Sequence, residues 1–565
     1  MKPLPARFLP TTRDEMDRLG WDRCDVVLIT GDAYVDHPSF GVPLIGRHLE
    51  SLGWRVGVIA QPDWNAPDDF LRLGQPGLFA GVGSGAMDSM VNRYTSLAKP
   101  RSEDAYSEGG EPGRRPDRAL LRYVNLVQRA MPGVPVVIGG IEASLRRLSH
   151  YDHWSGKVRK SILLDTKADL LVFGMGERAV AEVASRLADG RSLEGIPGTA
   201  VAMGRKAYDE GPPDCLELPS HEAVCADPAA FMRMTELVER ENNPWCGAAL
   251  SQAADTRVVV VRPPAPPLSR EEMDRLYALP FARRPHPSYR RPIPAYEMIR
   301  DSVTVVRGCA GGCSFCGLGL HQGRFLTSRS LDSVLREVRL LASEPSFRGT
   351  VSDLGGPTAN MYGLGGTDPA ACRTCRRSSC LHPSVCRSFS TGHGAYVDLL
   401  DAAAAQPGVK NVFVSSGVRF DLALRDPTFL RALAARHTSG YLKIAPEHFS
   451  REVLDLMRKP GVELWREFLR LFRAASAEAG REQYVVPYLM AAFPGCTEEH
   501  MREASRELRS EGIRPDKAQV FLPTPMTMAT AMYLTGLDPR GRALYVARKP
   551  SEKSRQLAAL RDGGS

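Results

Sequence analysis

The chain has 565 residues, more than one hydrophobic core supports, so two or three domains are expected. Its net charge of +8, from 73 basic and 65 acidic residues, is too mild to indicate a nucleic-acid partner by itself. No run of about 18 apolar residues predicts a membrane span, and the N-terminus lacks the apolar core of a signal peptide. We therefore expect a cytoplasmic protein with no membrane partner, whose clustered cysteines are reduced and available to a metal.

Strand and helix patterns alternate over residues 1–205. Such alternation predicts a doubly wound, Rossmann-like parallel sheet with helices on both faces. Ligands of such sheets lie beyond the carboxyl ends of the strands. The predicted strands are 25–31, 55–60, 78–85, 135–140 and 169–177, and the predicted helices include 42–53 and 118–131.

Residues 206–295 are rich in proline and predict a connector. Proline fixes extended backbone, so we expect little regular sheet there, above all in 262–267 and 281–294. A basic and aromatic run at 283–291 suits either a solvated linker face or a surface for an anionic substrate. The last segment, 541–565, predicts a basic tail that is a frayed helix or disordered.

A glycine-rich loop follows the apolar run 303–306, which predicts a buried strand. Cys309, Cys313 and Cys316 lie on this loop with the spacing C-x3-C-x2-C. Three thiolates are one too few for a closed structural zinc site, which takes four protein ligands. They suffice to hold three irons of a cubane cluster and leave the fourth iron open. Phe315, just before the third cysteine, would shield one side of such a cluster.

This C-x3-C-x-aromatic-C pattern resembles the signature of the radical S-adenosylmethionine (radical SAM) enzymes, and the wider chain resembles their YgiQ-like branch. The resemblance implies a [4Fe–4S] cluster on the three cysteines and S-adenosylmethionine (SAM) bound at the open iron. It implies reductive cleavage of SAM to methionine and a 5′-deoxyadenosyl radical, with a reductant such as flavodoxin or ferredoxin. It does not imply a substrate.

Six strand-like segments over 296–540 predict the partial (βα)6 barrel typical of radical SAM enzymes, with function at the carboxyl ends of the strands. Distinctive residues gather at those predicted ends. Gly355, Gly356 and Pro357 resemble the glycine pair whose carbonyl accepts the SAM amine, and Ser415, Ser416 and Arg419 suit hydroxyl and carboxylate contacts. Glu447 and His448 are candidates for acid–base catalysis or for binding the SAM ribose. The strands are 302–306, 350–354, 411–415, 441–445, 483–491 and 518–522.

A second cysteine set, Cys372, Cys375, Cys380 and Cys386, lies in an insert at 366–393 with the spacing C-x2-C-x4-C-x5-C. Four thiolates suit either a closed structural zinc or an additional iron–sulfur cluster. The insert has few apolar residues, so we expect a metal to hold it together. The sequence does not decide between zinc and a cluster.

Several radical SAM families carry an N-terminal domain of this shape that binds cobalamin through a D-x-H-x-x-G motif. Here His37 directly follows Asp36, and Gly41 has the wrong spacing. We therefore do not expect cobalamin. The leading hypothesis is a radical SAM enzyme acting on an unknown substrate. One alternative is methyl or methylthio transfer to RNA or another acceptor, and the other is a non-catalytic iron–sulfur sensor or RNA-binding protein.

Overall fold

The computed structural model describes residues 7–211, 214–514 and 518–562. The chain divides into two compact units. Unit 1 comprises Met1–Pro266 and Arg275–Arg300, and unit 2 comprises Pro267–Asp274 and Asp301–Ser565. None of the helices in the described part combines the length and hydropathy that crossing a bilayer takes.

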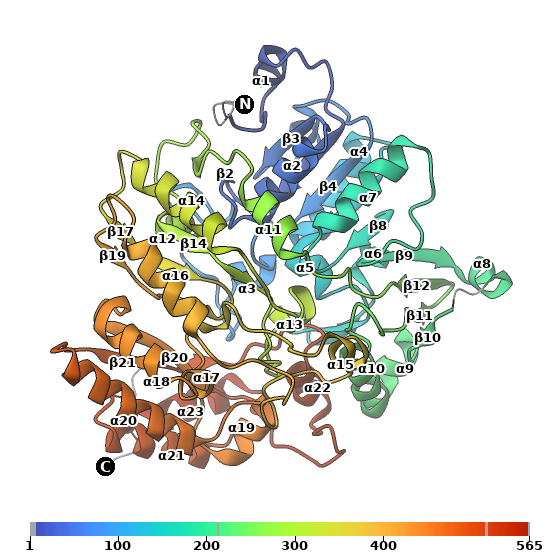
Figure 1. Cartoon of the computed structure of the whole chain (residues 1–565). Helices are drawn as coiled ribbons and strands as arrows, with labels where there is room; N and C mark the ends of the chain where they lie inside the picture. The colour runs from blue at the N-terminus through green and yellow to red at the C-terminus, as the bar shows by residue number, and fades with distance from the viewer. Residues whose placement is uncertain (1–6, 212–213, 515–517, 563–565) are drawn as a thin grey trace. The chain divides into compact units, whose positions relative to one another are not determined.

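Unit 1 is built on a nine-stranded sheet, which runs from blue to green in Figure 1. Five strands from β3 to β8 are parallel, and β9, β12 and β11 continue the sheet in antiparallel fashion. In spatial order the strands are β10 (Leu216–Glu217), β11 (Leu250–Ala254), β12 (Arg257–Val261), β9 (Thr199–Gly204), β8 (Leu170–Val172), β5 (Val136–Gly139), β4 (Phe79–Gly83), β1 (Val26–Thr30) and β3 (Val56–Ala60).

Apolar side chains on both sides of these strands require cover on both faces. Every residue of β1 is buried. Helices α2 (Gly41–Ser51) and α7 (Glu177–Ala188) pack against each other, and their apolar residues join one core with β1, β3 and β8. Helix α4 (Ala119–Ala130) packs instead against β4, β5 and the short helix α6 (Ile162–Thr166). This arrangement is the doubly wound sheet that the alternation predicts.

The segment predicted as a connector differs from the expectation, because much of it is regular structure. It supplies β10, β11 and β12 and the helices α9 (His221–Ala226) and α10 (Pro228–Arg240). The run Val258–Val261 is fully buried and pairs with β9 on one side and β11 on the other. The dense prolines begin only at Pro263, after the sheet has ended. The prolines that led to the prediction of a connector therefore lie after this strand, and the short valine run was the signal for it.

Unit 2 contains parallel strands in chain order, as a partial barrel requires. Pairs form between β14 and β18, β17 and β19, β20 and β21, and β21 and β22, and a single parallel bridge from Val418 to Ile444 links the third strand region to the fourth. The predicted α/β fold class is confirmed. The strands are β14 (Ser302–Thr304), β17 (Thr350–Val351), β18 (Asp353–Gly355), β19 (Asn411–Val412), β20 (Tyr441–Glu447), β21 (Tyr484–Ala491) and β22 (Gln519–Val520).

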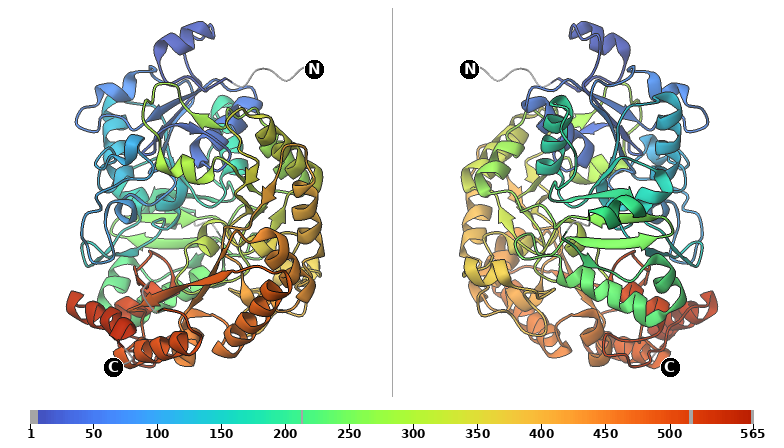
Figure 2. Two further views of the ribbon diagram at one scale, coloured as in Figure 1. Left: turned by 90° about the vertical axis from the view of Figure 1, so that its left-hand side faces the viewer. Right: turned by 90° about the vertical axis from the view of Figure 1, so that its right-hand side faces the viewer.

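Amphipathic helices cover the outside of these strands, as both views in Figure 2 show for the yellow and orange segments. Helix α14 begins at the predicted cap, where Ser330 accepts a hydrogen bond from the amide of Ser333. The others are α16 (Gly394–Ala404), α18 (Pro427–Ala432), α20 (Val462–Glu478) and α21 (Glu498–Ser510), and α14 itself spans Leu331–Ser343. Helix α22 (Met528–Thr535) differs, because every residue from Met528 to Tyr533 is buried.

The C-terminal segment, expected as a frayed helix or as disorder, forms a helix that packs on unit 2. Helix α23 (Pro550–Asp562) lies against α21. The buried Gln556 side chain donates to the carbonyl of Cys496 at 2.6 Å and accepts from the amide of Ala492 at 2.7 Å. Residues 563–565 lie outside the described part.

A buried ion pair fixes the first loop of unit 1. Arg47 and Asp36, with side chains 1% and 0% exposed, are joined by two hydrogen bonds.

Replacing Arg47 with Met leaves the Asp36 carboxylate buried without its cation, which costs ~3–5 kcal/mol. We expect R47M to lower the free energy of unfolding of unit 1 by that amount in urea titrations. R55M is the control, because Arg55 pairs with Asp22 and Asp25 at the surface, and we expect it to lose ~1 kcal/mol or less. Equal losses would contradict the assignment.

Candidate functional site: the cysteine loop at the barrel strand ends

The three-cysteine loop is held between the antiparallel strands β15 (Val306–Arg307) and β16 (Thr327–Ser328). The amide of Cys309 donates to the carbonyl of Gly323, and the amide of Cys316 donates to that of Cys313, which closes a turn. Ser314 is buried, and its hydroxyl donates to the carbonyl of Leu456 at 2.7 Å. These bonds fix the loop at both ends and in the middle.

The thiols of Cys309 and Cys313 lie close to Gly311. A Cβ at Gly311 would lie 3.4 Å from Sγ of Cys309 and 3.8 Å from Sγ of Cys313. Burial, with the charges of Cys313 and Cys309 adding to it, raises the pKa of Cys316 to about 12. A thiol with this pKa is protonated at neutral pH, so iron binding would release its proton. The donor set and its spacing fit a three-cysteine cluster.

Arg419 supplies a positive charge beside these thiols. Its Nη1 lies 3.9 Å from Sγ of Cys313, and its Nε and Nη2 donate to both carboxylate oxygens of Asp421 at 2.9 and 2.6 Å. Burial alone would lower the pKa of Arg419, but Asp421 raises it above its ordinary value. The guanidinium is therefore a fixed cation.

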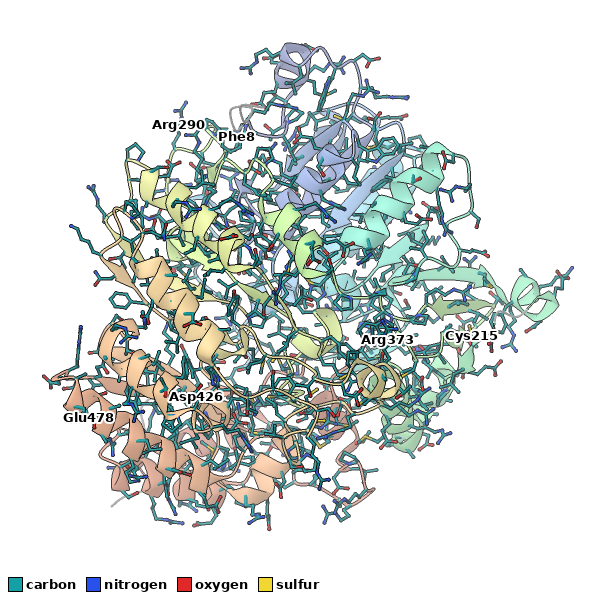
Figure 3. The ribbon with its side chains drawn as sticks, viewed as in Figure 1. Phe8, Cys215, Arg290, Arg373, Asp426 and Glu478 are labelled. Atoms are coloured by element: carbon teal, nitrogen blue, oxygen red, sulfur yellow. The ribbon has the colours of Figure 1, made fainter. Side chains whose placement is uncertain are left out.

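Asn360 holds the backbone of Arg419 in place. Its Oδ1 accepts from the amide of Arg419 at 2.8 Å, and its Nδ2 donates to the carbonyl of Arg419 at 3.0 Å. Nδ2 also lies 3.2 Å from Nε2 of His393, whose ring stacks on Phe429. The amide of His393 donates to Asp426, which is labelled in Figure 3 at the start of α18. Asn360 thus links the end of the second strand to the end of the third.

The glycine pair predicted to meet the SAM amine lies directly beside the cysteine loop. A Cβ at Gly356 would lie 2.4 Å from the carbonyl oxygen of Val306, just before the loop. Thr358 Oγ1 lies 3.7 Å from Sγ of Cys309. The segment from Gly355 through Pro357 to Thr358 is therefore positioned against the same thiols as Arg419.

Ser415 and Ser416 lie next to this segment, but their hydroxyls have protein partners. Ser415 donates to the carbonyl of Ser352 at 2.7 Å, and Ser416 donates to Asp353 at 3.1 Å. Asp353 also accepts both serine amides, and burial raises its pKa above the usual range. These contacts favour a role for the two serines in shaping the strand end.

Glu447 and His448 have different surroundings, although they are adjacent in sequence. Glu447 lies 3.8 Å from the Nζ of Lys459 and contributes to the raised pKa of Cys316, so it lies on the cluster side. Burial raises the pKa of Glu447, and Lys459 opposes that shift. Nδ1 of His448 accepts the amides of Phe449 and Ser450, both at 2.9 Å, and Nε2 lies 3.5 Å from Sγ of Cys496. Burial lowers the pKa of His448 to about 3.

Phe315 contacts Phe493 edge-on, with ring centroids 6.3 Å apart. It therefore packs between the cysteine loop and the end of β21.

Sequence reasoning missed Asp353, Asn360, Asp421 and Lys459, which orient the predicted residues. Asn360 and Asp353 could have been singled out as polar residues at strand ends, whereas Asp421 and Lys459 lie in runs with no distinguishing pattern.

The second cysteine set lies in the insert that follows the second strand. Cys372 is on α15 (Pro369–Thr374), next to Arg373, which Figure 3 labels. Burial raises the pKa of Cys380 to about 11, and Cys375, Cys386 and Cys372 all contribute to its electrostatic surroundings. Burial opposes the charge of Cys375, yet hydrogen bonds from Arg324 and Arg377 lower the pKa of that thiol.

His37, the histidine compared above with the cobalamin motif, is buried in unit 1. Its Nδ1 accepts the amide of Ser39 at 3.1 Å, and its buried Nε2 has no hydrogen-bond partner among the described residues. A neutral imidazole that accepts at Nδ1 carries its proton on Nε2. Ligation of a metal through Nε2 would therefore need the other tautomer.

Comparison with known proteins identifies the class. Residues 8–302 match the family model described as Radical SAM N-terminal, and residues 303–508 match that of the Radical SAM superfamily. The protein is therefore an enzyme of the radical SAM superfamily, and this class implies a [4Fe–4S] cluster and SAM.

Curated relatives narrow the assignment. The chain is 52% identical to a UPF0313 protein of Geobacter sulfurreducens over 98% of this chain and 92% of that one. It is 46% identical to the UPF0313 protein YgiQ of Salmonella typhimurium over 96% of this chain and 83% of that one. The chain belongs to the UPF0313, or YgiQ, family, as the resemblance of the wider chain predicts.

Solved structures share the fold at low identity. The radical SAM methyltransferase TsrM of Kitasatospora setae, solved with cobalamin and a [4Fe–4S] cluster bound, has a TM-score of 0.52 at 15% identity over 95% of this chain and 91% of that one. A second TsrM structure, with tryptophan and a SAM analogue, has a TM-score of 0.50 at 15% identity, with 95% of this chain and 89% of that one covered. The expectation against cobalamin is not borne out, because the fold of this chain is shared with a cobalamin-bound enzyme.

The close approach at Gly356 leads to a prediction. In G356A the added methyl group meets the carbonyl of Val306 and must push the strand end away from the cysteine loop. We expect a loss of ~1–3 kcal/mol in stability and a lower iron content after reconstitution. G417A is the control, since a Cβ there would meet no described atom within 4 Å. If both variants keep full iron, the glycine is not needed for packing at the loop.

A second prediction separates a structural from a catalytic role for His448. H448A leaves the buried amides of Phe449 and Ser450 without their acceptor, at ~1–3 kcal/mol each, so the melting temperature falls. H448N offers an amide oxygen close to the position of Nδ1 and should recover much of that loss together with SAM cleavage. A stable H448N protein without SAM cleavage would instead support acid–base catalysis.

Proposed function

We propose that this chain cleaves SAM reductively and acts on a substrate through the 5′-deoxyadenosyl radical. The observation that carries the proposal is that Arg419 and the segment of Gly355 and Gly356 lie against the loop that carries the three cysteines. A [4Fe–4S] cluster on Cys309, Cys313 and Cys316 would supply the electron and an open iron for the amino and carboxylate groups of SAM. The electron would come from a reductant such as a flavodoxin or ferredoxin.

The residues of the chain bind and orient SAM in this proposal. Nη1 of Arg419 points toward the cysteine loop, while Asp421 holds the other side of the guanidinium. In this position Nη1 would attract the carboxylate of SAM. The backbone of Gly355 and Gly356 would accept the SAM amine. Glu447, on the same side, could accept a hydrogen bond from the ribose or a proton from the substrate.

Lys459 and Glu447 set the charge next to these groups. Both side chains are mostly buried, and the lysine balances the carboxylate at 3.8 Å. Phe315 and Phe493 exclude water from one side of the loop, which protects a radical from quenching. The role of the chain is therefore positioning and exclusion of solvent, because the cofactor supplies the reactive species.

The test is anaerobic reconstitution, reduction with dithionite in the presence of SAM, and chromatography for 5′-deoxyadenosine and methionine. We expect both products from the native protein and neither from C309A/C313A/C316A. We expect R419M to cleave SAM at least ~10-fold more slowly, from the loss of one buried charge-assisted hydrogen bond. A loaded and reducible cluster that leaves SAM intact would point to the sensor hypothesis and defeat the proposal.

Methyl transfer is the second candidate, favoured by the fold shared with TsrM. Its mark would be S-adenosylhomocysteine formed together with a methylated acceptor. The same chromatographic assay separates the two functions, because reductive cleavage yields 5′-deoxyadenosine instead. RNA is one acceptor class to include in the assay, alongside small molecules.

A further inference from the structure

We propose that Cys372, Cys375, Cys380 and Cys386 hold a second iron–sulfur cluster, built directly against the loop of the first. The proposal concerns a separate metal centre and goes beyond the cleavage of SAM. Four cysteines in an insert suit either zinc or a cluster, and the structure supplies observations that favour the cluster.

The insert is fastened to the cysteine loop by backbone contacts. The amide of Cys380 donates to the carbonyl of Ala310 at 3.0 Å, and the hydroxyl of Ser379 donates to the carbonyl of Gly311 at 2.8 Å. A Cβ at Gly312 would lie 2.4 Å from the carbonyl oxygen of Ser378. Cys380, the third cysteine of the second set, is therefore hydrogen-bonded to Ala310, the residue that follows Cys309.

Apolar packing joins the two cysteine sets. Cys309 of the first set and Cys380 and Cys386 of the second pack against one small core. The other members of that core come from the loop, the insert and the ends of neighbouring strands, namely Ala310, Leu326, Met361, Leu364, Leu381, Val385, Phe389 and Leu422. A low-dielectric wall of this kind suits a cluster shielded from water.

Zinc and a cluster require different spacings of their thiolate ligands. Among the residues that the structure describes, no group of three or more His, Cys, Asp or Glu side chains could hold a single metal ion, and this applies to both cysteine sets alike. A tetrahedral zinc site needs all four sulfurs about 2.3 Å from one centre. A cluster places its irons and sulfides between the thiolates, so its ligands stand further apart.

A buried arginine neutralises the site from within the protein. Nη1 of Arg324 lies 3.3 Å from Sγ of Cys375, and Nη2 donates to the carbonyl of Cys375 at 2.5 Å. The side chain is buried, and Nη1 also donates to the carbonyl of Arg377. Donors to a ligating sulfur tune the potential of iron–sulfur clusters. Arg324 lies in the chain between the first cysteine set and β16, and its side chain contacts the second set.

The part of the insert that carries Cys372 is weakly packed. Helix α15 buries none of its residues, whereas the ends of the insert are joined by the bridge between Gly366 and Phe389 and by hydrogen bonds from the amides of Thr367 and Ser390 to the carbonyls of Ser388 and Gly365. Metal binding supplies the folding free energy of such loops.

The experiment uses three variants of the full-length chain, purified anaerobically from iron-replete cells. C309A/C313A/C316A removes the first set, C372A/C375A removes half of the second, and C225A is the control for loss of an exposed thiol outside both sets. Iron, sulfide and zinc are measured per chain before and after reconstitution, with Mössbauer and EPR spectra. We expect about eight irons in the native protein and in C225A, and about four in each of the other variants. A C309A/C313A/C316A protein that carries about one zinc, or no metal, would overturn the proposal.

Arg324 gives a second readout that does not depend on removing cysteines. In the C309A/C313A/C316A background, R324Q keeps all four thiols but removes a positive charge from beside Cys375. We expect the remaining cluster to assemble and to have a lower reduction potential, because the reduced state loses its neighbouring cation. An unchanged potential would contradict the assignment. Failure of SAM cleavage in the native protein is measured separately and bears only on the proposed function.

Discussion

Close backbone packing around the cysteine loop is the constraint on which the site depends. At Gly308, Gly312 and Gly356 an added Cβ would lie between 2.2 and 2.4 Å from a carbonyl oxygen of another segment. Those carbonyls belong to Phe325, Ser378 and Val306, which lie on the return strand, the insert and the strand before the loop. Three separate segments therefore determine the path of the loop before any cluster binds, and the thiols are presented in a fixed arrangement.

Charge balance follows from that arrangement. Three thiolates and a buried carboxylate in one place would repel one another, so cations must accompany them. Arg419 and Lys459 meet this need on the first set, and Arg324 meets it on the second. The arginines are each held by further acceptors, Asp421 for one and backbone carbonyls for the other. A fixed cation costs no reorganisation when the charge of the cluster changes, which suits a redox centre.

The sequence predicts the parts of this site whose chemistry is local. Cysteine spacing and glycine content identify Cys309, Cys313 and Cys316, and strand periodicity brings Gly356 and Arg419 to the same edge. The sequence does not predict which side chains from distant segments contact one another. Asn360 orients Arg419 across 59 positions of sequence, and Asp353 orients Ser416 across 63. The separate surroundings of Glu447 and His448 depend on the register shift in β20 and on the positive φ of Glu447, which no pattern reveals.

Long-range packing also explains the misjudged elements of the fold. Val258–Val261 forms a strand only because β9 and β11 flank it, and α23 is ordered by the burial of Gln556 against β21 and Cys496. The composition of a segment is an average over all its residues, so it does not reveal that one face or one short run within the segment is buried. The same limit applies to the choice between zinc and a cluster, since ligand spacing in sequence is alike for both.

Fold and side-chain chemistry carry separate information about unit 1. The fold shared with a cobalamin-bound enzyme concerns the path of the backbone, and at 15% identity it does not say which side chains would meet a ligand. The chemistry of His37 is a property of one side chain, whose Nδ1 accepts a hydrogen bond from the amide of Ser39. A corrinoid held without that imidazole would be compatible with both observations, because backbone at the strand ends can approach a ligand without a side-chain bond.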